Sequence, residues 1–245
     1  MSAMTLLVLI ALVALVYASV GHGGASGYLA AMSLFAYAPA HMASSALLLN
    51  VLVAGTSWLA FRRAGPGSPH LLWPFLVGSV SAAFVGGGLP VSARTYGWLL
   101  AVALLIAAVR LRLPVPDVSG TKIRRPARVV AAAVGAAIGL ISGVVGVGGG
   151  IFLSPLMILL RWADPKSTAA ASAGFIVVNS LAGLAGRVAA GRFVVGPVTP
   201  LVSAAFAGGL VGARLGAHHV SGLWLRRVLA AVLVVAAGKL LVVHA

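Results

Sequence analysis

A long apolar stretch is interrupted by a cluster of glycines twice in this chain, about half its length apart. The first cluster spans 21–27, between the apolar runs 4–20 and 28–37, and the second spans 146–150, between 129–145 and 151–160. Glycine inside a helix lowers its stability by roughly 1 kcal/mol relative to alanine, so contiguous glycines predict that the helix is interrupted there. Backbone groups freed by a break in hydrocarbon must lie within protein or line a cavity. Paired broken segments in matching halves are typical of a transporter's binding site.

The composition predicts a protein that crosses a membrane several times. Of the 245 residues, 61% are hydrophobic and 8% are charged, which is far more apolar than a soluble domain of this size. The first 61 residues contain no Asp, Glu, Lys or Arg, and one helical crossing needs about 20 residues. We therefore expect a multi-pass protein of the inner (plasma) membrane, with the lipid bilayer as its surroundings and no soluble domain.

The charges are strongly unbalanced, with 17 Lys and Arg against two acids, Asp117 and Asp164. The basic residues sit at segment ends and in short loops, as the positive-inside rule describes, so we expect no nucleic-acid partner. Two acids do not favour a carboxylate proton relay, and a positive interior suits an anionic substrate.

The chain has no cysteine, no Walker motif and no nucleophile–base pair. We expect no enzyme activity, metal site or cofactor.

An ordered series of matching residues indicates an internal duplication of roughly 125 residues. The matching pairs, 125 to 129 residues apart, are Gly21 and Gly146, Pro39 and Pro165, Asn50 and Asn179, Pro74 and Pro200, and Gly97 and Gly222. The chain thus divides into an N-terminal transmembrane repeat (1–113), a basic linker (114–127) and a C-terminal transmembrane repeat (128–245). Each repeat contains a glycine-broken segment and three further spans. The spans are expected at 42–61, 71–93 and 95–111, and at 167–186, 196–217 and 223–243.

The path of the broken segment decides the topology. If it crosses the membrane once, the repeats are parallel and the Lys and Arg residues divide 11 to 6 between the two sides. If it returns to its starting side, the repeats are inverted and 13 of the 17 lie on one side, leaving Arg94, Arg187, Arg192 and Lys239 on the other. The positive-inside rule prefers the second division. We therefore predict an all-α fold with two inverted repeats, each a glycine-broken helical hairpin plus three transmembrane helices, and both termini outside the cytoplasm.

The glycine clusters are the candidate substrate site. If the short runs after them are half-helices, their N-termini present free N–H groups and the positive end of a helix dipole, which favours an anion. The alternative is that these glycines only permit close helix crossing, the interpretation we prefer for Gly208, Gly209 and Gly212. The predicted substrate-binding residues are Gly21, His22, Gly23, Gly24, Ser26, Asn50, Gly146, Gly148, Gly149, Gly150 and Asn179.

The polar members of this set each have two interpretations. His22, which Val147 replaces in the second cluster, either protonates and holds the anion or is a neutral histidine bonded to backbone. Asn50 and Asn179 either contact substrate or satisfy carbonyls freed at the breaks, with a slight preference for the structural role. Ser26 is a plausible cap of the first half-helix. Arg62 and Arg187, at the ends of equivalent spans, are expected to be interfacial anchors, not ligands.

The motif Ser142-Gly143-Val144-Val145-Gly146-Val147-Gly148-Gly149-Gly150-Ile151-Phe152-Leu153-Ser154-Pro155 resembles the signature of the TauE/SafE sulfite exporter family. The continuation from Asp164 to Ser172, with Asn179-Ser180 and Gly183, is also similar to that family, and the first half resembles its N-terminal copy more weakly. The resemblance implies an exporter or permease for sulfite, sulfonates such as sulfoacetate, or related small anions.

These arguments together predict a secondary transporter that binds a small anion between broken helices near the bilayer midplane. The residues by themselves lead only to a secondary transporter of an anion, and the sulfur-containing substrate comes from the resemblance. The alternatives are an anion channel with a glycine-lined filter, a carrier of a non-sulfur organic anion, and a membrane enzyme or assembly factor. A homodimer is left open.

Overall fold

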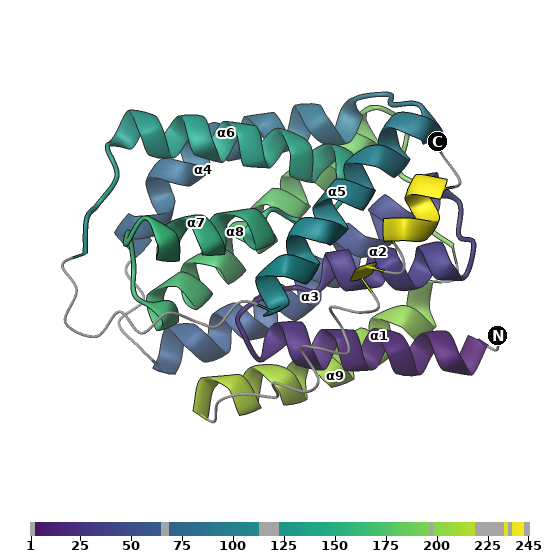
Figure 1. The fold of residues 1–245 in the computed structure, drawn as a ribbon, viewed down its shortest axis with the longest axis horizontal. Helices are drawn as coiled ribbons and strands as arrows, with labels where there is room; N and C mark the ends of the chain where they lie inside the picture. The colour runs from purple at the N-terminus through teal and green to yellow at the C-terminus, as the bar shows by residue number, and fades with distance from the viewer. Residues whose placement is uncertain are drawn as a thin grey trace.

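The computed structural model describes residues 3–64, 69–112, 123–196, 198–218, 233–234 and 237–242, and its regular elements there are helices (Figure 1). The N-terminal half contains α1 (Ala3–Ala18), α2 (Ala25–Leu34), α3 (Pro39–Ala64), α4 (Pro69–Gly88) and α5 (Ala93–Arg112). The C-terminal half contains α6 (Arg128–Val145), α7 (Gly150–Leu159), α8 (Pro165–Ala189) and α9 (Val198–His218). Most of the span expected at 223–243, Gly222, and the linker residues 114–122 lie outside the described residues.

Both predicted helix breaks are present. The first separates α1 from α2, and the second separates α6 from α7. Gly24 precedes α2 with a φ of 95°, and Gly146 and Gly149 flank the second break with φ values of 87° and 83°. Residues with a Cβ rarely adopt this left-handed conformation, so the breaks require glycine at these positions.

The second broken segment returns to the side from which it started. The backbone N–H of Arg124, just before α6, donates a hydrogen bond of 2.9 Å to the carbonyl of Arg161, just after α7. In Figure 1, α1 runs from the right-hand edge towards the left, whereas its counterpart α6 runs from left to right. The first helices of the two halves, α1 and α6, therefore point in opposite directions.

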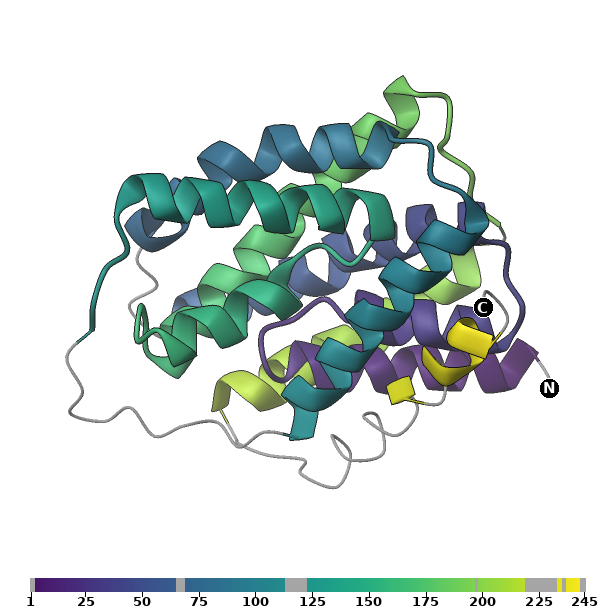
Figure 2. The same cartoon turned by 45° about the horizontal axis from the view of Figure 1, so that its top comes forward.

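The helices pack as two bundles, each of which includes one helix from the other half of the chain. The first bundle contains α1, α2, α3 and α9, and the second contains α4, α6, α7 and α8 (Figure 2). The helices α3 and α8 pack together where the bundles meet, and α5 lies against α2, α6 and α7. Each half of the chain thus packs its fourth helix, α4 or α9, in the bundle of the other half.

Glycines allow the exchanged helices to approach their partners closely. An added Cβ on Gly208 or Gly212 of α9 would collide with the carbonyl oxygen of Ala11 or Leu15 on α1. Gly135 and Gly139 of α6 meet the carbonyls of α4 in the same way. The prediction that the glycines of α9 serve helix packing is confirmed for these residues and also for Gly209, which packs against Val53.

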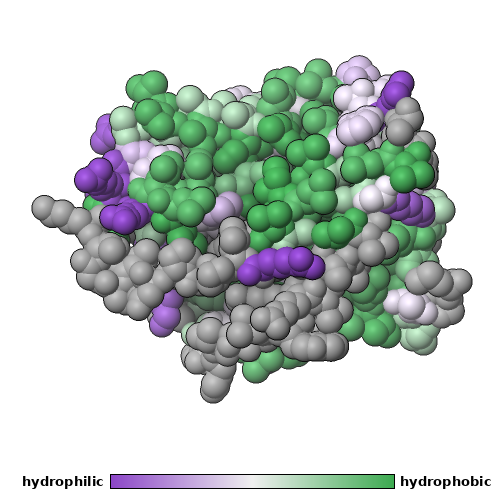
Figure 3. Space-filling model, in the orientation of Figure 1, coloured by the Kyte–Doolittle hydropathy of each residue, from purple (hydrophilic) through white to green (hydrophobic). Residues whose placement is uncertain are grey.

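The outer surface suits a lipid environment. Five described helices, α3, α4, α6, α8 and α9, contain segments long and apolar enough to cross a bilayer. Apolar residues cover most of the upper part of the face in Figure 3, and hydrophilic residues gather mainly towards its left and right edges, apart from one hydrophilic side chain near the middle. Several large apolar side chains are well exposed, with Val129 at 80% and Trp73 at 68%. The prediction of a multi-pass membrane protein is confirmed.

Candidate functional site

The two glycine-rich breaks meet at the interface between the bundles. We call residues 21–24 the first glycine loop and residues 146–149 the second glycine loop. Gly23 and Gly148 both lie against the side chains of Asn50 on α3 and Ile176 on α8. A Cβ added to Gly148 would lie 2.6 Å from Asn50 Nδ2 and 2.9 Å from Ile176 Cγ2. Residues from both halves of the chain that the sequence predicted to share one site therefore lie together.

Each loop also rests on the long helix of the opposite half. Gly21 packs against Ala169 of α8, where an added Cβ would lie 2.6 Å from the Ala169 Cβ. Gly146 packs against Ala43 of α3, where an added Cβ would lie 2.9 Å from the Ala43 Cα. Since α3 and α8 belong to different bundles, the two loops connect the bundles symmetrically.

The side chain of Asn50 is oriented by the first half-helix. Its Oδ1 accepts a hydrogen bond of 3.1 Å from the backbone N–H of Ala25, the first residue of α2. Because only the oxygen of an amide accepts, the Nδ2 group is fixed as a donor directed away from α2. That group is buried, lies next to Gly148 and has no hydrogen-bond partner. Asn50 thus presents an unused N–H donor to the second glycine loop.

Two serines add unpartnered hydroxyls around the same loop. Ser180 Oγ would lie 2.9 Å from a Cβ on Gly148, and Ser142 Oγ would lie 2.8 Å from a Cβ on Gly149. Both side chains are at most 1% exposed and neither hydroxyl has a partner. The helix α7 begins after Gly149, which has no side chain to accept from its first N–H groups. Sequence reasoning missed these serines, because serine is common in membrane helices and gives no periodic signal.

Asn179 differs from its repeat partner Asn50. Its Nδ2 donates a 2.9 Å hydrogen bond to the Phe175 carbonyl, one turn earlier in the same helix, and its Oδ1 has no partner. The expectation that both asparagines satisfy carbonyls freed at the breaks is wrong. Asn50 satisfies an N–H group at a break, and Asn179 binds a carbonyl within its own helix.

His22 links the two bundles. Its Nδ1 lies 3.0 Å from the carbonyl oxygen of Val20, and its Nε2 lies 2.8 Å from Ser154 Oγ on α7. The side chain is 7% exposed. Among the described residues there is no group of three His, Cys, Asp or Glu side chains that would hold a metal ion. His22 therefore bonds to backbone, as one interpretation proposed, and also to a serine that sequence reasoning did not identify.

Ser26 does not cap α2. The helix begins at Ala25 and its N-cap residue is Gly24, so Ser26 lies within the first turn. The Ser26 hydroxyl forms a 2.7 Å hydrogen bond with the hydroxyl of Tyr17 on α1. The predicted cap is wrong because the helix starts two residues earlier than a Ser26 cap requires, and the N–H of Ala25 already binds Asn50.

Arg187 is also placed differently from the prediction. It is 4% exposed, and its Nη2 donates hydrogen bonds of 2.9 Å to Val144 and 3.3 Å to Gly143, at the end of α6. The Tyr96 hydroxyl donates to the next carbonyl, Val145, at 3.2 Å. The interpretation of Arg187 as an interfacial anchor is therefore wrong. Its counterpart Arg62 is exposed and lies 4.9 Å above the Trp58 ring.

Comparison with known proteins identifies the family. Residues 6–240 match the family model described as sulfite exporter TauE/SafE. The chain is 34% identical over 232 residues, 94% of each sequence, to the probable membrane transporter protein y4hK of Sinorhizobium fredii (strain NBRC 101917 / NGR234). No solved structure matches it significantly. A family match over nearly the whole length, which includes both glycine loops, shows that the chain belongs to the sulfite exporter TauE/SafE family.

Proposed function

We propose that the protein is a secondary transporter of small anions, with sulfite or an organosulfonate as its substrate. The observation that carries this proposal is the fixed, unpartnered Nδ2 of Asn50 beside Gly148. A buried donor without an acceptor is unfavourable, and an anion bound there supplies the acceptor. We place the anion at the second glycine loop, between the two bundles.

The groups around this loop are donors suited to an oxyanion. They are the first N–H groups of α7, the Nδ2 of Asn50 and the hydroxyl of Ser180. The N-terminal end of α7 adds a partial positive charge. Among the described residues the only carboxylate is Asp164, which precedes α8. A sulfite or sulfonate group has several oxygens around one sulfur and accepts from several of these donors at once.

The burial of the site favours a carrier over a channel. Asn50 and Ser180 are each at most 1% exposed. The substrate reaches such a site only after the bundles rearrange, as alternating access requires. A channel needs a path open along its length. Single-channel conductance far above the turnover of a carrier would support the channel alternative.

The same proposal includes inverted repeats in the inner membrane, with both termini outside the cytoplasm. The opposite directions of α1 and α6 support it, as do the 13 of 17 basic residues assigned to one face. A reporter that fluoresces only in the cytoplasm, fused after Ala245, should give a full-length but dark protein. A bright, full-length fusion would contradict the inverted arrangement.

The substrate class is tested by measuring binding of sulfite, sulfoacetate, taurine, thiosulfate and lactate to the purified protein. We expect sulfite or sulfoacetate to bind best. Asn50→Asp keeps an acceptor for Ala25 but replaces the free donor with a negative charge, so anion affinity should fall by about 100-fold. Ser180→Ala should weaken it by about 3- to 10-fold. The control Ser203→Ala removes an exposed hydroxyl of α9 and should leave binding unchanged.

Binding of anions by Asn50→Asp with the wild-type affinity would refute the proposed site. Lactate as the preferred ligand would keep the transporter but replace its substrate class with the non-sulfur organic anions.

A further inference from the structure

The hydrogen bond between His22 and Ser154 connects the two halves of the chain and the two bundles. His22 lies in the first glycine loop, next to α2 of the first bundle, and Ser154 lies on α7 of the second. Both side chains are buried, at 7% and 1% exposure. The bond therefore crosses the interface that contains the proposed anion site.

The hydrogen-bond partner of His22 Nδ1 determines whether Nε2 or the Ser154 hydroxyl is the donor in this bond. Nδ1 faces the carbonyl oxygen of Val20 at 3.0 Å, and a carbonyl only accepts, so Nδ1 carries a hydrogen. In the neutral ring Nε2 is then an acceptor, and Ser154 donates to it. In the protonated ring Nε2–H donates to Ser154 Oγ. Both contacts persist in both charge states, and only the Ser154 hydroxyl hydrogen has to turn.

In the part of the chain that the structure describes, the titratable groups on the helices around His22 are tyrosines and basic side chains. The Tyr17 ring of α1 lies 6.5 Å from the imidazole, and α2 contributes Tyr28. α7 carries no titratable side chain. The helices that pack on α2 and α7 carry basic groups and a tyrosine near their ends: His41, Arg62 and Arg63 on α3, Arg94, Tyr96, Arg110 and Arg112 on α5, and Lys166 and Arg187 on α8. Among the described residues, Asp164 is the sole acid.

We propose that His22 binds the proton that travels with the anion, and that its bond to Ser154 transmits the change of charge between the bundles. The inference rests on the proposed function, because it concerns coupling at the same site. Nε2 takes a proton from water on one side of the membrane and returns it to water on the other, while Nδ1 keeps its hydrogen. The imidazolium charge balances the anion, and protonation releases the Ser154 hydroxyl hydrogen to donate elsewhere in the site.

The experiment uses the full-length protein in liposomes that contain a pH-sensitive dye, with labelled sulfoacetate as the probe. The sulfonate group of this probe stays ionised across the pH range of the assay. For the wild type we expect sulfoacetate entry to carry protons inwards and to accelerate as pH falls from 8 to 6. His22→Gln keeps hydrogen bonding but cannot protonate. It should still exchange sulfoacetate, at least 3-fold more slowly, with a flat pH profile and no proton entry.

Variants of Ser154 provide a test that keeps the histidine. Ser154→Ala removes the acceptor that the protonated ring needs, so the pH profile of flux should move to lower pH by at least half a unit. Ser154→Thr keeps the hydroxyl and should restore the wild-type profile. Unchanged profiles in Ser154→Ala, or proton entry with His22→Gln in the wild-type ratio, would overturn the coupling role.

Binding measurements separate this inference from the proposed function. If sulfoacetate binds the wild type tightly but its entry moves no protons, the coupling role fails while the transporter assignment stands. If neither sulfoacetate nor the other anions of the panel bind at pH 6 or pH 8, the proposed function fails and the coupling role fails with it.

Discussion

In the first broken segment, α2 begins with its Ala25 N–H bonded to Asn50, whereas in the second broken segment α7 begins after Gly149 with no side-chain cap. Asn179, the repeat partner of Asn50, is turned onto its own helix instead. The two broken segments, α1–α2 and α6–α7, therefore have the same order of helix, glycine loop and short helix but differ in hydrogen bonding. The first half-helix has a side-chain partner for its first N–H group, and the second has no side-chain cap. This difference is why we place the anion at the second loop.

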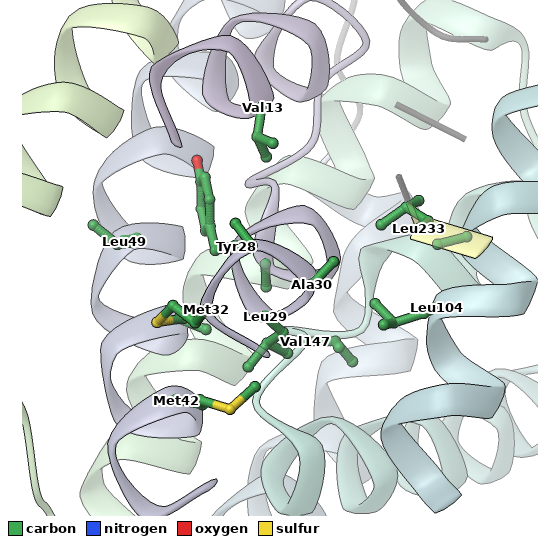
Figure 4. Close-up of a cluster of buried hydrophobic side chains, with 14 of the residues drawn as sticks. Val13, Tyr28, Leu29, Ala30, Met32, Met42, Leu49, Leu104, Val147 and Leu233 are labelled. Atoms are coloured by element: carbon green, nitrogen blue, oxygen red, sulfur yellow. The ribbon is translucent and has the colours of Figure 1, made fainter. Parts of the chain in front are cut away.

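The helices that lead into the two breaks, α1 and α6, also differ in what binds the carbonyl groups at their C-terminal ends. At the end of α6, Arg187 and Tyr96 together bind three successive carbonyls. At the end of α1, the Ala18 carbonyl accepts a backbone hydrogen bond of 3.1 Å from Gly21 and a longer one of 3.4 Å from the Ser57 hydroxyl. Val147, the counterpart of His22, is 4% exposed and lies close to Leu29 and Met42 in an apolar cluster (Figure 4). The second loop is thus held by a cation and apolar packing, and the first by backbone hydrogen bonds and the polar contacts of His22.

The largest effect is expected from Gly149→Val in the second loop. A β-branched residue disfavours the φ of 83°, and its side chain would press on Phe175 and Ser142. Sulfoacetate flux should fall at least about 100-fold, because displaced donors no longer match the anion. Gly191→Ala is the control, with a φ of 65° and open space around it, and should transport normally. Wild-type affinity in Gly149→Val would show that the anion binds elsewhere.

A smaller effect is expected when the two asparagines are exchanged for leucine. Asn50→Leu removes both the cap on α2 and the free donor, so the KM for anion uptake should rise by about 10- to 100-fold. Asn179→Leu removes a bond to its own helix and should raise the KM by less than about 3-fold. Equal KM values for the two variants would contradict the proposed difference between Asn50 and Asn179 in anion binding.

Thermal unfolding in detergent compares the contributions of Arg187 and Arg62 to the stability of the protein. Arg187→Met removes a buried cation that binds two carbonyls, which should lower stability by about 2 kcal/mol and the Tm by roughly 4–8 °C. Arg62→Met removes an exposed cation stacked on Trp58 and should lower stability by less than about 1 kcal/mol. Matching Tm values for the two variants would argue against the proposed role of Arg187 in holding α6.

The smallest effect concerns the start of α8. Asp164 accepts 3.0 Å hydrogen bonds from the backbone N–H groups of Lys166 and Ser167, whereas Ala38 before α3 has no capping side chain. Asp164→Ala should lower stability by about 1 kcal/mol. Partial burial opposes ionisation, but the bonds from Ser167 and Lys166 outweigh it and hold the pKa of this carboxyl below its usual range.

A lowered pKa gives this contribution a defined pH dependence. The stabilisation by Asp164 is complete above the pKa of about 3.9 of an unfolded Asp, and it disappears as pH falls through the lower folded value. The Tm difference between wild type and Asp164→Ala should therefore stay constant from pH 8 to 5 and shrink below about pH 4. A difference that grows on acidification would contradict the capping role.

The sequence predicted the helix breaks, and its expected spans at 42–61 and 167–186 begin within three residues of the observed starts of α3 at Pro39 and α8 at Pro165, because glycine and proline act locally on the backbone. It also predicted that Asn50 lies near the glycines, through the duplication. The burial of Arg187 and the bond between His22 and Ser154 were not predictable, since their partners are 43 or more residues away. Helices that are apolar on most sides carry little periodic signal to show which faces meet.

The exchange of α4 and α9 between the bundles determines when the protein can fold during synthesis. α1 is the first helix to leave the ribosome, but the glycine face that receives it, around Gly208 and Gly212, is made last among the helices described in full. Until then the N-terminal half lacks one wall of its bundle, and its buried polar groups lack their final surroundings. Truncation before α9 should therefore leave the face of α1 that packs on α9 uncovered and the protein vulnerable to membrane proteases, although the site residues Asn50, Gly148 and Ser180 would all be present.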